Sequence, residues 1–200
     1  MEIKRFLDKV ASNAPTPGGG SASALAGALS ASLVAMVAGL SLKKEKGMEK
    51  EMRETKRKAL IIQKRLFRAI REDASSFEAV IKAFRLPRAT ERARSHRVKE
   101  IQKAYQKAAL TPQLVCEQTV QLLEYSKFLI MKGNPNAVSD AGVAAFLADA
   151  ALAGGLLNIG INLAPITEKP FLKKMRLLMQ GWAKRRNILM EGVLQSFMKI

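Results

Sequence analysis

Apolar residues recur along this chain at the three- and four-residue spacing of amphipathic helices, with short breaks rich in proline, glycine or charge. The spacing predicts helices over residues 3–10, 21–42, 49–86, a segment following Thr90, 111–131, 141–163 and 168–198. Pro112 suits the first turn of a helix, so a new helix is expected to start at Thr111. No window alternates like a strand. We therefore predict an all-α protein: a single helical-bundle domain over residues 1–200, with six or seven helices.

Residues 21–42 carry no charge and are small or apolar on every side. A helix of this kind is expected to be buried all round. One small domain offers too few neighbours for that, so the pattern indicates a partner chain and a homodimer. The segment is also long enough to cross a bilayer, but its Ala, Gly and Ser content favours close packing inside a protein. Because residues 1–10 read as an amphipathic helix and not a leader, we expect a cytoplasmic protein without membrane contact.

The stretch before that helix, residues 14–21, contains two prolines and three consecutive glycines and ends at Ser21. Glycine permits close backbone approaches, and Ser21 stands where a helix N-cap is expected. Such a loop directs free N–H groups and the positive end of the helix dipole at the space in front of it, which suits an anion or a carbonyl-rich ligand. A plain tight loop between two packed helices is the alternative.

The charge balance is 34 basic against 17 acidic residues, a net +17. This excess favours an anionic partner: nucleic acid, a membrane surface or a polyanionic small molecule. A nucleic-acid-binding protein is disfavoured because the chain has no helix-turn-helix signature, no interleaved aromatics and no basic tail. The single cysteine, Cys116, excludes an intrachain disulfide and a cysteine zinc site, and it is expected to pack as a small hydrophobe. We expect no metal.

Several segments, taken in order, resemble the C-terminal domain family of formiminotransferase-cyclodeaminase. They are Pro15–Ser21 with Ala26–Ala28 and Met36–Val37, Asp73–Phe77, Leu86–Glu91, Arg97 with Ile101, Gln102, Ala104 and Pro112, Gly133–Val143, and the pair Asn158 and Asn162. The resemblance spans residues 3–165. It implies an all-helical, dimeric domain with no cofactor, whose substrate is a tetrahydrofolate derivative. The segment 40–47 departs from the family's pattern, because it keeps the lysines but lacks the usual Gly and Tyr.

The family implies two reactions that the sequence does not separate. The leading expectation is formiminotetrahydrofolate cyclodeaminase, which closes 5-formimino-tetrahydrofolate to 5,10-methenyl-tetrahydrofolate and releases ammonia. The alternative is methenyltetrahydrofolate cyclohydrolase, which adds water to the methenyl carbon and yields 10-formyl-tetrahydrofolate. Both reactions take a proton from a nucleophile and give one to a leaving nitrogen. A folate-binding or nucleic-acid-binding helical protein without catalysis is the further alternative.

Two carboxylates are the candidate catalytic groups. Asp140 opens a predicted helix, where it can transfer protons, bind the pterin or serve only as a first-turn acid. Asp73 lies one turn before Phe77; burial there would raise its pKa as suits a general acid, and a salt bridge is the alternative. Asn158 and Asn162 lie one turn apart on an apolar helix, so their amides need partners, either a bound pterin or a dimer interface.

The remaining candidates are substrate-binding residues. Lys43, Lys44 and Arg97 are candidates for binding the carboxylates of a folate glutamate tail, including a polyglutamate, although an exposed charge is the favoured explanation for any one of them taken singly. The loop and turn candidates that the resemblance implies are Pro17, Gly18, Gly19, Gly20, Ser21, Asn134 and Ser139.

Overall fold

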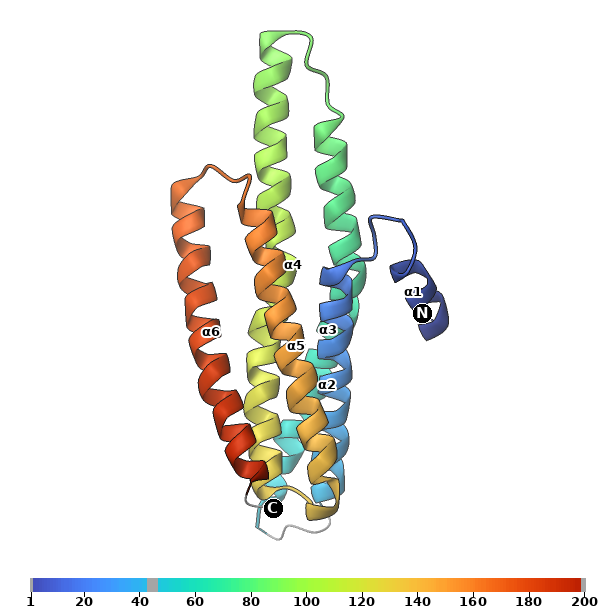
Figure 1. The fold of residues 1–200 in the computed structure, drawn as a ribbon, viewed down its shortest axis with the longest axis vertical. Coiled ribbons are helices and arrows are strands. Elements are labelled where there is room, and N and C mark those ends of the chain that lie inside the picture. The colour runs from blue at the N-terminus through green and yellow to red at the C-terminus, as the bar shows by residue number, and fades with distance from the viewer. Residues whose placement is uncertain (1, 43–46, 199–200) are drawn as a thin grey trace.

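The computed structural model describes residues 2–42 and 47–198, and this part of the chain forms helices and no strand (Figure 1). The elements are α1 (Ile3–Val10), α2 (Gly19–Ser41), α3 (Glu49–Phe84), α4 (Glu91–Lys132), the short 3-10 helix η1 (Pro135–Ala137), α5 (Val138–Leu163) and α6 (Lys169–Phe197). The all-α prediction is confirmed.

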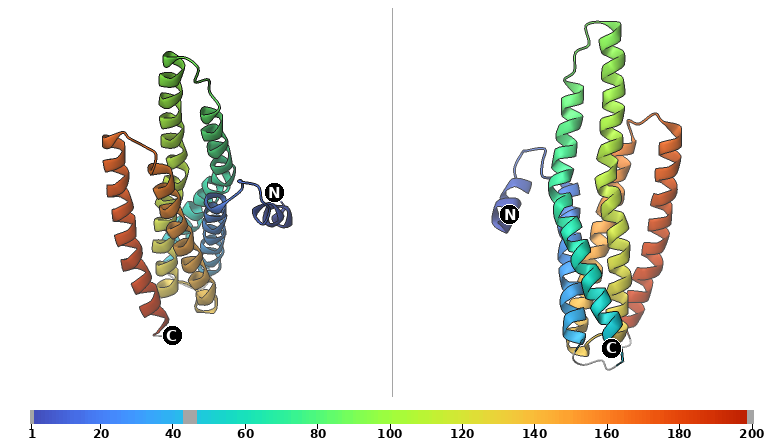
Figure 2. Two further views of the ribbon diagram at one scale, coloured as in Figure 1. Left: turned by 45° about the horizontal axis from the view of Figure 1, so that its top comes forward. Right: turned by 180° about the vertical axis from the view of Figure 1, so that it is seen from behind.

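Helices α2, α3, α4 and α5 form a four-helix bundle in which each packs against two neighbours in a closed ring. Helix α6 packs along α4 and α5, and α1 stands beside α3, away from the bundle axis (Figures 1 and 2). The hairpin of α3 and α4 extends beyond the other helices at one end of the molecule (Figure 2). Apolar helix faces explain the arrangement, because each must be covered by another helix.

The predicted helix start at Thr111 was wrong, because α4 runs through Thr111 and Pro112 without a break. Proline removes one backbone bond from a helix interior and disfavours the position. Here the helix is held by packing: a Cβ on Gly155 of α5 would lie 2.7 Å from Cys116 Sγ and 3.3 Å from the Pro112 carbonyl oxygen. The predicted start after Thr90 is confirmed, since Thr90 Oγ1 accepts the Ala93 N–H at 3.2 Å.

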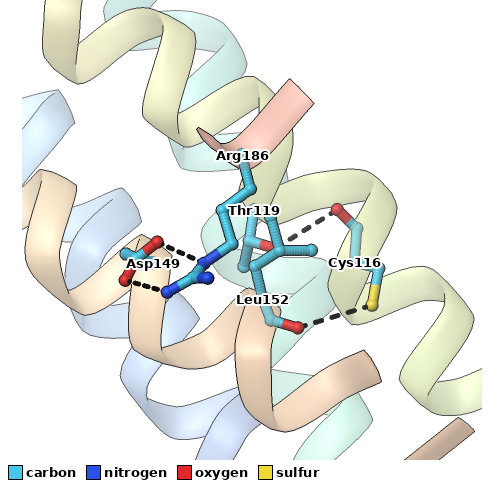
Figure 3. Close-up of polar contacts among 5 residues, drawn as sticks. All are labelled: Cys116, Thr119, Asp149, Leu152 and Arg186. Atoms are coloured by element: carbon cyan, nitrogen blue, oxygen red, sulfur yellow. Dashed lines mark hydrogen bonds and ion pairs between the residues drawn. The ribbon is translucent and has the colours of Figure 1, made fainter. Parts of the chain in front are cut away.

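Polar contacts tie α5 to α4 and to α6 (Figure 3). Arg186 of α6 donates from Nε and Nη2 to the two carboxylate oxygens of Asp149, at 2.6 and 2.7 Å. Cys116 of α4 is fully buried, and its thiol donates to the Leu152 carbonyl at 3.8 Å. Burial raises the pKa of this thiol to about 12. Cys116 therefore packs as a small hydrophobe, as expected.

One face of the bundle, formed by α2 and α5, is open to solvent. It carries seven exposed large apolar side chains: Leu29, Met36 and Leu40 on α2, and Val143, Phe146, Leu157 and Ile161 on α5. We call these seven residues the α2–α5 face. Their side chains are 42–76% exposed, so a single chain leaves this side of α2 uncovered, and its burial by a partner chain stays a prediction. Physically, α2 and α5 have bundle neighbours on one side only.

By length and composition, α2 and the segment Pro135–Leu163 would each be able to cross a membrane. In α2, half of the apolar stretch of membrane-spanning length is buried inside the protein, and in the second segment 39% of the corresponding stretch is buried. Ser30 Oγ of α2 donates to the Ala144 carbonyl of α5 at 2.7 Å, so the two helices are joined to each other by a polar contact as well as by packing.

Candidate functional site

The glycine loop meets α3 at Asp73. Helix α2 begins at Gly19, with Gly18 as its N-cap residue, so the expected N-cap role of Ser21 was wrong. Ser21 is buried in the first turn, and its hydroxyl lies 2.9 Å from Asp73 Oδ2 and 3.1 Å from the Ile70 carbonyl oxygen. Ser21 therefore links the loop to α3 instead of capping its own helix.

A serine hydroxyl has a single proton, so it can donate to only one of these two acceptors at a time. When that proton goes to the Ile70 carbonyl, a protonated Asp73 donates to Ser21 Oγ, and the chain of hydrogen bonds is complete. Burial raises the pKa of Asp73 above the ordinary aspartate value, and the hydrogen bonds with Ser21 offset the shift only in part. The site is therefore suited to an aspartate that gains and loses a proton.

Glycine at position 20 is a steric requirement of this contact. A Cβ on Gly20 would lie 2.1 Å from Asp73 Oδ1 and 2.6 Å from its Cγ. The first backbone bond of the helix runs from the Ala22 N–H to the Gly18 carbonyl, at 2.9 Å. The N–H groups of Gly19, Gly20 and Ser21 therefore stand outside the helix ladder, as the first turn of any helix leaves them. They provide donors beside the carboxyl.

Asn158 of α5 completes this end of the bundle. A Cβ on Gly19 would lie 3.7 Å from Asn158 Nδ2. The amide nitrogens of Asn158 and Asn162 donate one turn back along α5, to the Gly154 carbonyl at 2.7 Å and the Asn158 carbonyl at 2.9 Å. Their amide oxygens accept no hydrogen bond from the described residues, so each leaves an acceptor for a ligand or a second chain.

Asn134, Ser139 and Asp140 lie at the opposite end of the bundle. The Asn134 N–H donates to Ser41 Oγ, near the end of α2, at 2.8 Å, and Asn134 Oδ1 accepts the Asn136 N–H at 3.0 Å. Asn134 thus builds the turn before α5. Asp140 stands in the first turn of α5, where the helix dipole favours a negative charge. Helix α2 rises about 33 Å between its ends, so one chain does not bring Asp140 to Asp73.

The candidates for binding the glutamate tail are also dispersed. Lys43 and Lys44 lie outside the described residues. Arg97 donates from Nε and Nη2 to the Phe84 carbonyl, at 3.1 and 3.0 Å, and its guanidinium lies 5.5 Å from the centre of the Phe84 ring. It caps the end of α3, about 16 Å along that helix from Asp73. The structure therefore gives Arg97 a structural role and does not bring it to the glycine loop.

Sequence reasoning missed a cavity of about 650 Å³ beside the glycine loop, between α1 and α3. Its lining includes Arg5, Phe6, Lys9, Pro17, Ile70 and Arg71. The signal was present in the first helix, where Arg5 and Lys9 lie one turn apart just before the loop. Within residues 2–42 and 47–198, no three His, Cys, Asp or Glu side chains are grouped to hold a metal ion.

Comparison with known proteins gives consistent matches. The family profile described as formiminotransferase-cyclodeaminase matches residues 2–180. The methenyltetrahydrofolate cyclohydrolase of Methylorubrum extorquens is 33% identical over 196 residues, which cover 97% of this chain and 94% of that protein. The formimidoyltransferase-cyclodeaminase of Rattus norvegicus is 28% identical over 176 residues, and this chain spans 32% of its length. The crystal structure of formiminotetrahydrofolate cyclodeaminase from Thermotoga maritima matches with a TM-score of 0.87 at 30% identity, over 98% of this chain and 95% of that one.

Proposed function

The chain belongs to the formiminotransferase-cyclodeaminase family, and from that premise we propose that it is an enzyme acting on the one-carbon unit of a reduced folate. The cyclohydrolase reaction comes first, because the Methylorubrum relative with that name is 33% identical over nearly the full length of both chains. The cyclodeaminase reaction is the second candidate, which the match to the Thermotoga structure favours. This order reverses the one expected from the sequence alone.

The observation that carries the proposal is the partly buried contact of Asp73 with Ser21 at the glycine loop. In the cyclohydrolase reaction, water attacks the methenyl carbon and gives up a proton, which Asp73 accepts. The added hydroxyl then loses its proton as the formyl carbonyl forms, the bond from that carbon to N5 breaks, and N5 receives the proton held by Asp73. The product 10-formyl-tetrahydrofolate leaves, and one proton is released overall. A carboxyl whose pKa is raised by burial is suited to both transfers.

The same groups serve the cyclodeaminase reaction. There N10 attacks the formimino carbon and gives up its proton to Asp73, and the amino group on the tetrahedral carbon is protonated in turn. The carbon–nitrogen bond then breaks, neutral ammonia leaves, and the cationic methenyl bridge is formed. The N–H groups of Gly19 and Gly20, which lie outside the helix ladder at the start of α2, would bind a carbonyl or a developing negative charge on the ligand. The amide oxygen of Asn158 is placed to accept from a pterin N–H.

The first experiment follows the methenyl absorbance with the purified protein. Loss of the signal from 5,10-methenyl-tetrahydrofolate faster than in buffer supports the cyclohydrolase, and a rise from 5-formimino-tetrahydrofolate with ammonia release supports the cyclodeaminase. The Asp73→Asn variant should lose about 10²-fold or more in kcat. Folate binding without either turnover would refute the enzyme. A salt-sensitive shift of RNA or DNA instead would favour the nucleic-acid alternative.

A homodimer through the α2–α5 face is part of this proposal. Seven large apolar side chains, 42–76% exposed, gather on this face, and a grouped apolar surface of this kind is typical of a protein–protein interface. A twofold axis perpendicular to the helices would place α2 and α5 of two copies antiparallel. The Asp140 end of one copy then lies beside the glycine loop of the other, and the two groups of candidate residues form one site.

Complementation tests this composite site. Asp73→Asn and Asp140→Asn, each expected to be inactive alone, should regain about one quarter of the wild-type activity when co-expressed, because half of the dimers are mixed and each carries one intact site. No recovery would refute the composite site. Leu157→Glu, which places a charge on the α2–α5 face, should convert the dimer to a monomer in light scattering.

We also propose that the protein is soluble and cytoplasmic. The α2–α5 face is the surface that a second copy would cover, and reduced folates are water-soluble substrates. Sedimentation of the protein with lipid vesicles in the absence of detergent would contradict this.

A further inference from the structure

The cavity between α1 and α3 combines an apolar floor with a basic rim. Phe6 is the residue of α1 that is buried, at 6% exposed, and it lies beside Ile70 of α3 in the cavity lining. Arg5 and Lys9 reach the cavity from α1, and Arg71 reaches it from α3. Figure 1 shows α1 standing off the bundle beside α3, and Arg5, Lys9 and Arg71 are exposed.

The basic residues of this rim are not neutralised by acidic side chains within the described part of the chain. Arg5, Lys9 and Arg71 form no ion pair with any of the described residues, whereas Lys4, on the same short helix, pairs with Asp8 at 3.0 Å. Glu2 is the acid in the cavity lining. Because Arg5 and Lys9 are four residues apart, they project from one face of α1. The rim therefore carries a net positive charge toward the cavity.

The cavity borders the Asp73 site through neighbouring residues of α3. Ile70 lines the cavity, and its carbonyl lies 3.1 Å from Ser21 Oγ. Arg71 and Ala74 line it as well, and they flank Asp73 in the sequence of α3. Pro17, just before the glycines, closes the other side. Ile70 and Asp73 are about 4.5 Å apart along the helix axis, so a long ligand reacting at Asp73 can extend into this cavity.

We propose that this cavity binds the p-aminobenzoyl-oligoglutamate end of the folate, an inference that rests on the proposed function. The aromatic ring lies on Phe6 and Ile70, and the glutamate carboxylates pair with Arg5, Lys9 and Arg71. The volume of about 650 Å³ is within the range of small-molecule sites. Each added glutamate brings one more carboxylate to the basic rim, so the site favours polyglutamates.

The test has two independent measurements. The first is direct binding of p-aminobenzoyl-triglutamate, which carries no reacting carbon, by isothermal titration calorimetry. The second is the ratio of KM values for the monoglutamate and triglutamate forms of methenyl-tetrahydrofolate. We expect the wild type to bind the fragment, and to show a KM about 5-fold lower for the triglutamate at low salt, since exposed charge pairs contribute modestly. The advantage should shrink as salt screens the charges.

The variant Lys9→Ala with Arg71→Ala should lose fragment binding and bring the two KM values together. Arg176→Ala removes an exposed charge from α6 and should behave as wild type. Turnover with an unchanged triglutamate preference in the double variant would overturn this inference and leave the proposed function intact. If the wild type binds the fragment but turns over neither substrate, and the double variant does not bind the fragment, the binding site in the cavity is supported and the enzymatic function is refuted. No fragment binding by the wild type would overturn the inference.

Discussion

Replacing Gly20 by alanine tests the steric basis of the Asp73 site. The new Cβ would lie 2.1 Å from Asp73 Oδ1 and 2.8 Å from Oδ2, and a real Cβ is essentially never found within 3.0 Å of another heavy atom. The carboxyl must therefore retreat by about 1 Å, because both oxygens are too close for a simple rotation to relieve the clash. Overpacking of this kind costs about 1–3 kcal/mol of stability.

The effect on catalysis should be larger than the effect on stability. A displacement of about 1 Å in a reacting group costs on the order of 10²-fold in rate. We expect Gly20→Ala to lower kcat by about that factor, while the circular dichroism spectrum stays helical. Thermal unfolding and the methenyl absorbance assay, performed on one preparation, separate the two effects.

Gly181→Ala on α6 is the matched control. Nothing lies within 4 Å of a Cβ built on Gly181, and an alanine in a helix interior is more stable than a glycine by roughly 0.5–1 kcal/mol. This variant should therefore be slightly more stable and fully active. If Gly20→Ala kept kcat within twofold of the wild type, the argument that Gly20 is needed to position Asp73 would be refuted.

Three further predictions follow from buried groups. Because burial raises the pKa of Asp73, its contribution to stability is full below the ordinary value of 3.8 and is lost as the pH rises through the raised pKa. The melting temperature of Asp73→Asn relative to wild type should therefore increase with pH over that window, and a constant difference would contradict the shift. Arg186→Ala leaves Asp149, whose side chain is only 19% exposed, without its bidentate partner, and should cost about 2 kcal/mol in urea unfolding; a loss below 0.5 kcal/mol would argue against the pair. Cys116, with a pKa near 12 and no exposed surface, should react with a thiol reagent at pH 8 only after unfolding in guanidinium.

Sequence reasoning recovered the features that depend on near neighbours. The spacing of apolar residues located all the long helices, apart from the junction at Pro112, because a helix face is determined by residues three and four positions apart. The helix start after Thr90 is a local feature of the same kind, since the residue whose N–H Thr90 accepts, Ala93, is three positions away. The order of the motifs, from the glycine loop to Asn162, was sufficient to identify the family.

Some of the site followed from the sequence as well. Asp73 was chosen as a candidate, and its raised pKa was anticipated as a consequence of burial. The glycine loop was recognised as a special backbone segment, but its partner was not. The cavity between α1 and α3 was missed, because Lys9 and Arg71, which both line it, are 62 positions apart and each resembles an ordinary exposed charge in the sequence.

What the sequence by itself determined is therefore the class of fold, the helices and the family, all carried by local periodicity and by motif order. Tertiary structure alone decided which distant groups meet. Ser21 bonds to a carboxyl 52 residues away instead of capping its helix, and α4 continues through Pro112 because packing against α5 outweighs one lost backbone bond. Asp140 lies about 30 Å from Asp73 because long helices separate their ends by 1.5 Å per residue, a distance that no local pattern encodes.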